Sequence, residues 1–445
     1  MNDYNYVVIG SGPSVFRFLP GMQGSKQRIL VVEANDFGGI CPNAGCEPKI
    51  FFEGASKIAL ISQKLTGRGM ANPAKINWTQ LVQEKKNVFA PVPDNMQQLF
   101  EQQGNDTIQG TANFVDNHTI KVNDKLITSD HFVIATGLKP RSLDVPGNEY
   151  LLTSNDVFNM EELPESVAII GGGYIAMEIA SLLSVAGAHV TILLRSDRAL
   201  RAFDKHHVDM VVNEMKDSLG VEFQYQTEVQ TISHEDTQFQ VTTKDGRRLK
   251  FDKVINASGR VPNVDTLYLE NTDVKVDKKG IVVNEHLQTA AANIYAMGDV
   301  IKKEVPGLTS TAQFEGEYLS SYLRGHQSDG IHYPVIGTVA FTFPQIAEAG
   351  VNMDQAREDP DLTVKDLEIA QGDYFYTGTA DDKAHLSLAY DQQNKIVGAS
   401  EVSQTAVDDI NALIPVIALD VDPAVWQEKM ILIFPSLAYK LRSLV

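Results

Sequence analysis

The sequence predicts an α/β fold built around two copies of one strand–turn–helix–strand unit. Two short apolar runs, Tyr6 to Ile9 and Val167 to Ile170, each lead into a glycine-rich turn. Each turn precedes a helix-like segment and a second apolar strand, Arg28 to Glu33 in the first copy and His189 to Leu194 in the second. This order of elements is typical of dinucleotide-binding βαβ units, so we expect two Rossmann-like dinucleotide-binding domains in one chain.

Glycines in the first turn indicate a pyrophosphate site, because Gly10 permits a tight turn and Gly12 lets the backbone approach the phosphates. Val15 stands where a third glycine would allow close contact between helix and strand, and Pro20 predicts a short or displaced helix. Glu33 ends the second strand, where its carboxylate would accept hydrogen bonds from an adenosine ribose. The first site should therefore bind a dinucleotide without a 2′-phosphate, such as FAD or NAD.

The second turn carries Gly171 and Gly173, but Leu194 stands where the first unit has its carboxylate. Arg195 follows directly and Arg201 lies further along the chain. Two guanidinium groups near a ribose would bind a 2′-phosphate through charge-assisted hydrogen bonds, which favours NADPH. A solvated basic surface is the alternative interpretation.

The two cysteines of the chain, Cys41 and Cys46, have four residues between them. Pro42 and Gly45 predict a distorted helical turn that would bring the sulfurs within bonding range. Such a small ring would stabilise the fold by only about 2 kcal/mol, so thiol–disulfide exchange is the better explanation for the pair. A helix N-terminus would lower the thiol pKa and favour the thiolate.

Charge and composition exclude several classes of protein. The 445 residues include 57 acidic and 38 basic side chains, a formal net charge of −19, and 43% of them are hydrophobic. This is the composition of a globular protein, and such an acidic surface repels phosphates, so we expect no nucleic-acid and no membrane partner. We see no leader pattern and no apolar run of about 18 residues, which predicts a cytoplasmic protein.

The ordered set of motifs resembles the class I FAD-dependent pyridine nucleotide–disulfide oxidoreductases, a group that contains glutathione reductase, dihydrolipoamide dehydrogenase and mercuric reductase. The resemblance covers nearly the whole length. It rests on the two glycine turns, on Glu33, on the cysteine motif from Gly39 to Lys49, and on motifs that begin at Ala135, Ala257 and Ala296.

The resemblance implies a homodimer that uses FAD and NADPH. Changes in sequence pattern place boundaries near residues 150, 265 and 332, and the last segment mixes strand-like and helix-like runs. The expected parts are an FAD-binding domain in two pieces (1–150 and 266–332), an NADPH-binding domain (151–265) and a C-terminal α+β dimerisation domain (333–445).

The resemblance also implies roles for single residues. Cys46 would be the thiolate beside the flavin and Cys41 the thiol that meets the substrate, while Lys49 would pair with Glu178 near the flavin. Tyr174 would cover the nicotinamide pocket. FAD would contact Gly10, Gly12, Pro13, Ser14, Glu33, Gly39, Lys49, Ala112, Thr136, Gly137, Arg260, Gly298, Asp299 and Thr309. NADPH would contact Gly171, Gly173, Tyr174, Ile175, Glu178, Arg195, Arg201 and Gly259. No metal ion is expected.

The C-terminal segment departs from the family. Members that reduce disulfides usually carry a histidine that protonates the leaving thiolate and a glutamate that holds it, but here Phe434 and Tyr439 stand at these positions. Three interpretations stay open: Tyr439 supplies a catalytic hydroxyl, the substrate carries a good leaving group, or electrons leave for a quinone, oxygen or a metal ion. Packing of both rings at a dimer interface is compatible with all three.

The sequence therefore predicts an NADPH-dependent FAD disulfide reductase. Electrons would pass from NADPH through FAD to a Cys41–Cys46 disulfide and on to a low-molecular-weight disulfide or related oxidant. One alternative is an NADPH oxidase or a quinone or metal reductase without a thiol substrate. Another is a redox-sensing flavoprotein with little turnover.

Overall fold

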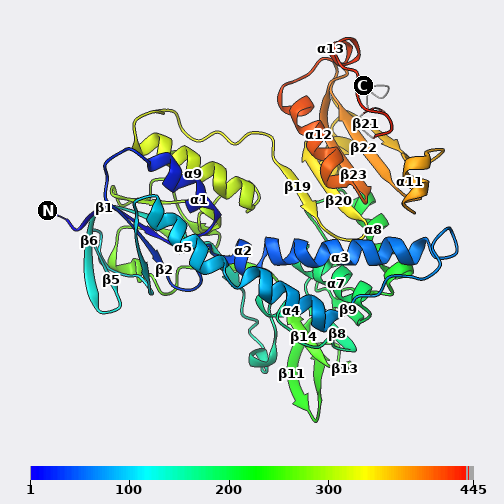
Figure 1. Cartoon of the computed structure of the whole chain (residues 1–445), viewed down its shortest axis with the longest axis horizontal. Coiled ribbons are helices and arrows are strands. Elements are labelled where there is room, and N and C mark those ends of the chain that lie inside the picture. Colours follow the sequence, from blue (N-terminus) through cyan, green and yellow to red (C-terminus); the bar gives the residue numbers. More distant parts are fainter. Residues whose placement is uncertain (1, 437–438, 440–445) are drawn as a thin grey trace. The chain divides into compact units, whose positions relative to one another are not determined.

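The computed structural model describes residues 2–436 and 439, and the chain forms two compact units (Figure 1). The first unit combines the segments Met1–Ile50, Gln83–Arg141 and Gly259–Tyr333. The second unit combines Phe51–Val82, Ser142–Ser258 and Pro334–Val445. The division into three domains that the sequence suggests is finer than this partition and stays a prediction.

A seven-stranded sheet forms the centre of the first unit, with the strand order β3-β2-β1-β6-β5-β4 and β18 paired to β6. Neighbours in the β3-β2-β1-β6 part and the β6–β18 pair run parallel, whereas β4, β5 and β6 pair antiparallel. The strands are β1 (Tyr4–Ile9), β2 (Ile29–Glu33), β3 (Asp106–Gln109), β4 (Asn113–Asp116), β5 (Thr119–Val122), β6 (Lys125–Ile134) and β18 (Ile294–Ala296).

Helix α1 (Pro13–Met22) packs along α9 (Thr309–Leu323) in the first unit (Figure 1). A Cβ atom added at Gly316 of α9 would lie 2.0 Å from the carbonyl oxygen of Ser14, so the glycine allows this close approach. Helix α1 has 10 residues against 13 in α7 and is short, as expected. Pro20 lies inside α1 rather than ending it, because so near the C-terminus the missing N–H affects only the last turn.

The second unit contains a four-stranded parallel sheet with the order β10-β9-β8-β14 and a three-stranded antiparallel sheet, β11-β12-β13. Their elements are β8 (Ser166–Ile170), α7 (Tyr174–Ala186), β9 (His189–Leu193), α8 (Lys205–Leu219), β10 (Glu222–Gln224), β11 (Val229–Glu235), β12 (Gln238–Thr243), β13 (Arg248–Phe251) and β14 (Lys253–Asn256).

An antiparallel sheet with the order β19-β20-β23-β22-β21 and the helices packed on it follow in the C-terminal part of the second unit. This is the α+β pattern that the sequence predicts for this segment. Its elements are β19 (Gly337–Ala340), β20 (Gln345–Gly350), α10 (Met353–Glu358), β21 (Thr363–Leu367), α11 (Tyr374–Gly378), β22 (His385–Tyr390), β23 (Ile396–Ser403), α12 (Ala406–Ala418) and α13 (Pro423–Lys429).

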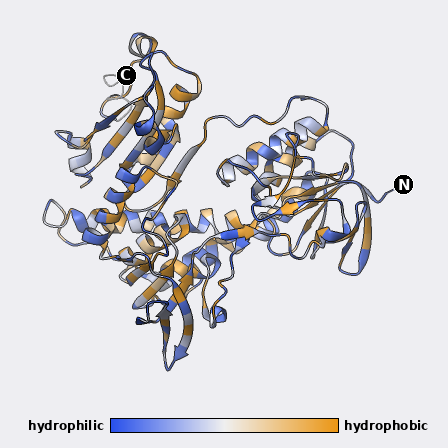
Figure 2. Cartoon of the chain, turned by 180° about the vertical axis from the view of Figure 1, so that it is seen from behind, coloured by the Kyte–Doolittle hydropathy of each residue, from blue (hydrophilic) through white to orange (hydrophobic). Residues whose placement is uncertain are grey.

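Hydrophobic residues concentrate in the strands of these sheets (Figure 2). The parallel strands are buried along most of their length, as expected for strands covered on both faces. Among the described residues, no helix combines the length and the apolar character that a membrane crossing needs. The remaining elements are α2 (Ile40–Ala44), α3 (Cys46–Lys64), α4 (Trp78–Phe89), α5 (Val92–Gln102), β7 (Leu138–Pro140), α6 (Ser154–Val157), β15 (Arg260–Pro262), β16 (Val276–Asp277) and β17 (Gly280–Ile281).

Candidate active site

The two glycine turns have the same steric role. Gly10 has a φ of +104°, and a Cβ atom there would lie 2.4 Å from the carbonyl oxygen of Ala135. Gly171 has a φ of +129°, and its Cβ atom would lie 2.2 Å from the carbonyl oxygen of Ala257. In each unit the turn thus presses against the end of the neighbouring strand, which only a glycine permits. Both turns lead directly into a helix, α1 and α7, as the pattern predicts.

Glu33 ends β2 and is held by two donors. The hydroxyl of Ser11 donates to Oε2 at 2.6 Å, and the backbone N–H of Asn35 donates to Oε1 at 2.9 Å. Ser11 in turn accepts the N–H of Gly38 at 2.9 Å, so one serine joins the glycine turn, the carboxylate and the loop before the cysteines. The carboxylate is fixed where an adenosine ribose is expected. Ser11 is missed by sequence reasoning because it occupies the variable position between two glycines.

Three polar side-chain atoms near the expected flavin site are buried, and none has a hydrogen-bond partner among the described residues. They are Thr136 Oγ1, Thr311 Oγ1 and Asp299 Oδ1, and the last of these has only an ion pair of 3.6 Å with Lys303. A Cβ atom at Gly39 would lie 2.8 Å from the Cα atom of Gly12, so two backbone turns meet without side chains. Unsatisfied buried polar groups are costly, and a ligand rich in hydroxyl and phosphate groups would satisfy them. These residues fit FAD.

Asp299 lies between two cations. Burial raises the pKa of Asp299, while the charges of Lys303 and Arg260 oppose the shift. Arg260 also donates to the carbonyl of Leu138 at 2.7 Å, and burial lowers the pKa of its guanidinium. Lys303 lies 3.6 Å from Asp299 Oδ1 and 2.7 Å from Oε1 of the fully buried Glu315. Lys303 is a residue that sequence reasoning missed, because it belongs to no recognisable motif.

The cysteine pair occupies a broken helical turn, as Pro42 and Gly45 predict. Helix α2 ends at Ala44, Gly45 takes φ −124° and ψ −114°, and α3 begins at Cys46. Cys41 is half-buried and Cys46 is exposed. The hydroxyl of Thr309, the first residue of α9, donates to Sγ of Cys41 at 3.4 Å and lies 3.6 Å from Sγ of Cys46. One hydroxyl therefore lies within hydrogen-bonding distance of both sulfurs.

The pKa of the Cys41 thiol is raised, chiefly by its hydrogen bond with Cys46 and then by burial, while the Thr309 hydroxyl lowers it. The expected lowering of the thiol pKa is not found for Cys41, because the neighbouring sulfur and burial raise its pKa.

Lys49 and Glu178 lie on different elements of different units. Lys49 is in the first turn of α3, and its backbone N–H donates to the carbonyl of Gly45 at 3.1 Å. Glu178 is buried on α7, where its Oε1 accepts the backbone N–H of Phe341 at 2.9 Å. The predicted pairing of these two side chains stays a prediction. The contribution of Phe341 was missed, since a backbone donor leaves no sequence signal.

Tyr174 is the first residue of α7, and its ring meets the edge of the Phe203 ring with centroids 5.3 Å apart. Burial raises the pKa of Tyr174 to about 12, and the carboxylates of Glu348 and Glu178 add to the shift. The ring therefore stays a neutral phenol. Ile175 follows it and is half-buried.

The arginines after β9 are accessible. Leu194 is buried, whereas Arg195 and Arg201 are exposed. Arg201 forms an ion pair of 2.8 Å with Asp197, which a 2′-phosphate would have to displace. The arrangement is compatible with the predicted phosphate site.

The other residues expected to contact FAD or NADPH lie in the first unit. Gly259 was assigned to NADPH, but it lies in the first unit, where its carbonyl accepts the N–H of Arg141 at 3.0 Å. That assignment stays a prediction. The remaining FAD candidates lie in the first unit: Pro13 and Ser14 at the start of α1, the buried Ala112, Gly137 after β6, and Gly298, whose N–H donates to Glu315 at 2.6 Å.

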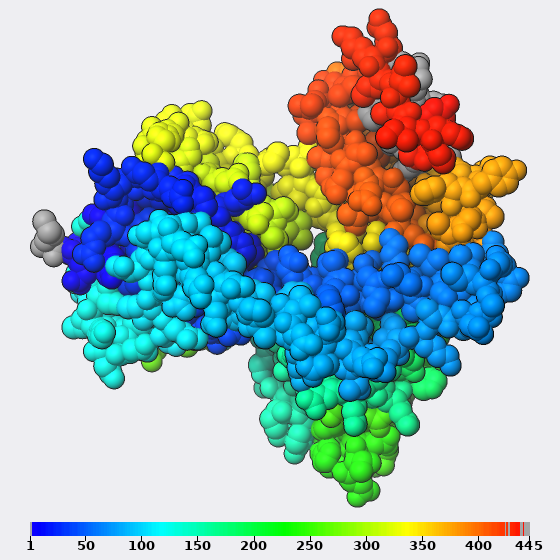
Figure 3. Space-filling model, viewed as in Figure 1, coloured from blue at the N-terminus to red at the C-terminus, as the bar shows by residue number. Residues whose placement is uncertain are grey.

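Phe434 and Tyr439 pack against each other, with ring centroids 5.1 Å apart and planes at 76°. Phe434 is 73% exposed, and the neighbouring Ile431 and Ile433 are 92% and 83% exposed. In Figure 3 the C-terminal segment, coloured red, lies on the surface. Nothing in this contact supplies a proton donor other than the Tyr439 hydroxyl.

Known proteins match this chain over most of its length. A family model described as pyridine nucleotide-disulphide oxidoreductase matches residues 4–316. Mercuric reductase from Staphylococcus aureus is 32% identical over 431 residues, covering 92% of this chain and 76% of that protein. Glutathione reductase from Nostoc sp. is 29% identical over 435 residues, covering 92% of this chain and 93% of that protein.

Solved structures match as well. The HOCl-induced flavoprotein disulfide reductase RclA from Escherichia coli is 25% identical, with a TM-score of 0.88 and 99% of both chains covered. Its Cu(II) complex matches with a TM-score of 0.89 at the same identity and coverage. These matches confirm the predicted fold class and the disulfide reductase class of oxidoreductase. The chain belongs to the pyridine nucleotide-disulphide oxidoreductase family, whose members use FAD and NAD(P)H.

Proposed function

We propose that the protein is an NADPH-dependent FAD disulfide reductase whose Cys41 and Cys46 cycle between dithiol and disulfide. The observation that carries this proposal is the Thr309 hydroxyl within reach of both sulfurs, 3.4 Å from Cys41 and 3.6 Å from Cys46. When bound, FAD supplies the acceptor for the hydride of the reduced nicotinamide and the electron pair for the disulfide.

The two cysteines have different tasks in the exchange. Cys41 attacks one sulfur of a substrate disulfide, so that a mixed disulfide forms and one substrate thiolate leaves. Cys46 then attacks the Cys41 sulfur, which releases the second substrate thiolate and forms the Cys41–Cys46 disulfide. The Thr309 hydroxyl favours the attack, because its hydrogen bond lowers the pKa of Cys41.

Leaving thiolates need a proton, and Phe434 offers none. We therefore favour substrates whose thiols are acidic, such as aromatic or strongly electron-poor low-molecular-weight disulfides, over those that need a general acid. Tyr439 is a weak substitute because an ordinary phenol titrates near pH 10.

A homodimer in the cytoplasm is part of the proposal. The side chains of Ile431, Ile433 and Phe434 form an exposed apolar group. Monomeric proteins rarely expose such a group, and a second copy of the chain would cover it. Size measurement in solution against a variant with all three residues changed to serine tests this part.

Reduction of a metal ion is a second candidate, with Cu(II) or Hg(II) as the substrate. It is favoured by the missing histidine and by the relatives, since a mercuric reductase is 32% identical and a solved relative is a Cu(II) complex. Among the described residues no group of three His, Cys, Asp or Glu side chains is arranged to hold a metal ion. The ion would therefore depend on two soft sulfur ligands.

One experiment separates the candidates. Purified holoprotein is mixed with NADPH without oxygen, its accessible thiols are counted, and disulfides, Cu(II), a quinone or oxygen are then added in turn. Two new thiols that disappear on adding a disulfide, with renewed NADPH consumption, support the main proposal. NADPH consumption only with Cu(II), and its loss in Cys41→Ser, support reduction of a metal ion. NADPH consumption with oxygen or a quinone that persists in Cys41→Ser supports an oxidase. No NADPH consumption with any of these oxidants supports a sensor.

A further inference from the structure

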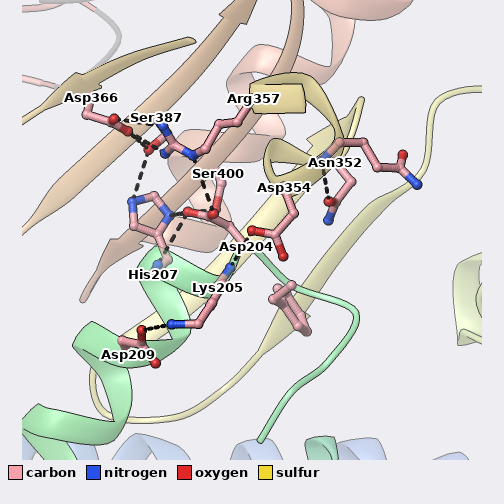
Figure 4. A network of polar contacts seen from close by, with 12 residues as sticks. Asp204, Lys205, His207, Asp209, Asn352, Asp354, Arg357, Asp366, Ser387 and Ser400 are labelled. Atoms are coloured by element: carbon pink, nitrogen blue, oxygen red, sulfur yellow. Dashed lines mark hydrogen bonds and ion pairs between the residues drawn. The ribbon is translucent and has the colours of Figure 1, made fainter. Parts of the chain in front are cut away.

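A chain of hydrogen bonds runs through the interior of the second unit. His207 on α8 is fully buried, and its Nε2 lies 2.8 Å from Nδ1 of His385 on β22. Its Nδ1 lies 2.6 Å from Oγ of Ser400 on β23. The Ser400 hydroxyl donates to Oε1 of Glu348 on β20 at 3.0 Å. Figure 4 shows His207 pointing from its helix toward Ser400 and Ser387 on the sheet.

All the bonds of this chain point the same way. The one hydroxyl proton of Ser400 goes to Glu348, so Ser400 accepts from Nδ1–H of His207. Burial and the neighbouring His385 lower the pKa of His207, which is therefore neutral, and its Nε2 must accept from His385. Donation thus runs from His385 through His207 and Ser400 to the carboxylate.

The two ends of this chain of hydrogen bonds lie in different parts of the second unit. His385 lines a cavity of about 920 Å³ in the second unit, together with the exposed His206. At the other end, the backbone N–H of Asp204 donates to Glu348. Asp204 directly follows Phe203, whose ring meets the ring of Tyr174 at 5.3 Å. The hydrogen bonds therefore connect the cavity with Asp204, and Phe203, the residue before Asp204, contacts the Tyr174 ring.

We propose that Glu348 positions the Tyr174 ring through Asp204 and Phe203, and that His385, His207 and Ser400 exchange the Glu348 proton with the cavity. The inference rests on the proposed function, because it takes Tyr174 as the cover of the nicotinamide site. A proton that arrives at Nε2 of His385 moves the Nδ1 proton to His207, the His207 proton to Ser400 and the Ser400 proton to Glu348. One proton enters, and one carboxylate becomes neutral.

Protonation of Glu348 weakens its hold on the Asp204 N–H, because a neutral carboxyl is a poorer acceptor than a carboxylate. Burial raises the pKa of Glu348 to about 7, and the charges of Asp204 and Asp354 add to the shift. The ring is thus held in place above pH 7 and released below it. Charged or titratable groups around Glu348 are Tyr174 from α7, Asp204 just before α8, His207 from α8 and Asp354 from α10. Arg357 pairs with Asp204 and Arg198 pairs with Asp354.

Binding of NADP⁺ by the holoprotein tests the proposal, because the ring must move aside for the nicotinamide. We expect the dissociation constant to be about tenfold lower at pH 6 than at pH 8. Glu348→Gln, a neutral carboxamide of the same shape, should bind at both pH values as the wild type does at pH 6. NAD⁺ is titrated in parallel, because a 2′-phosphate itself titrates near pH 6. The same pH profile in wild type and Glu348→Gln would overturn the proposal.

Two further variants keep the test decisive if Glu348→Gln does not fold. Tyr174→Ala removes the ring, so the pH dependence of NAD⁺ binding should vanish; its persistence would overturn the proposal. His385→Gln should keep the equilibrium profile but slow the response of binding to a pH jump at least tenfold. His206→Gln is the matched control, since His206 lines the cavity outside the hydrogen-bond chain, and it should respond as the wild type does. An unslowed His385→Gln would exclude the relay.

Failure of this proposal and failure of the proposed function give different results. Failure to form thiols with NADPH would disprove the reductase while the binding profiles remain measurable. Intact thiol formation with pH-independent nucleotide binding would disprove only the role of Glu348.

Discussion

Thr309 donates a hydrogen bond to Sγ of Cys41 at 3.4 Å, and this hydroxyl opposes the rise in pKa that Cys46 and burial impose on Cys41. A residue in the first turn of α9 therefore affects the pKa of a thiol on the short helix α2, more than 250 residues earlier in the sequence. The relationship gives the first prediction.

Thr309→Val should raise the pKa of Cys41 further and slow disulfide exchange about tenfold near neutral pH. The loss should shrink as pH rises, because hydroxide then removes the proton that Thr309 no longer helps to release. The pH dependence of alkylation of the reduced pair measures this effect. Thr309→Ser keeps the hydroxyl and should behave as the wild type does; equal alkylation in Thr309→Val and wild type would contradict the role of the hydroxyl.

Arg195→Ala should raise KM for NADPH at least tenfold and leave KM for NADH nearly unchanged, because only NADPH carries the 2′-phosphate. Steady-state kinetics with both nucleotides decide this. Equal changes for NADPH and NADH would disprove the nucleotide assignment.

Asp197→Ala offers the reverse prediction. It releases Arg201 from an ion pair of 2.8 Å, so KM for NADPH should fall. The effect should be several-fold and should disappear at high salt, where exposed charges are screened. A higher KM would show that Arg201 does not face the phosphate.

Glu214→Gln should destabilise the second unit at pH 7 by about 2 kcal/mol. Burial acts to raise the pKa of Glu214, but hydrogen bonds from Lys383, Lys64 and Ser218 outweigh it and lower the pKa to about 2. A lowered folded-state pKa stabilises the fold above the unfolded-state pKa, and this contribution is lost as pH falls from about 4.5 to about 2. Denaturant unfolding at pH 7 and at pH 2 should therefore show a difference between variant and wild type only at pH 7.

Phe434→His, combined with Tyr439→Glu, should restore a general acid if this segment occupies the place that the family resemblance implies. Turnover with a disulfide of a weakly acidic thiol should rise at least tenfold, since general acids contribute 10²- to 10⁴-fold. Turnover with Cu(II) needs no such proton and should not change. Phe434→Leu controls for the loss of the ring, and an unchanged disulfide rate in the double variant would contradict the prediction.

The sequence predicts what depends on neighbours in the chain. The turns at Gly10 and Gly171 and the broken helix at Gly45 follow from local backbone sterics, which short motifs encode. Contacts between distant segments leave no such signal. His207 and His385 meet only because α8 packs on the C-terminal sheet, and Lys303 reaches Glu315 only after α9 has formed.

The carbonyl of Ala135 fills the space beside Gly10, and the carbonyl of Ala257 fills the space beside Gly171. A single methyl group at Gly171 would therefore block the second turn and leave the first untouched. Such a protein would keep its coloured prosthetic group while losing its natural electron donor. It would become a reductase that a chemical or an electrode can drive, which would allow the sulfur chemistry to be studied without the nicotinamide half of the cycle.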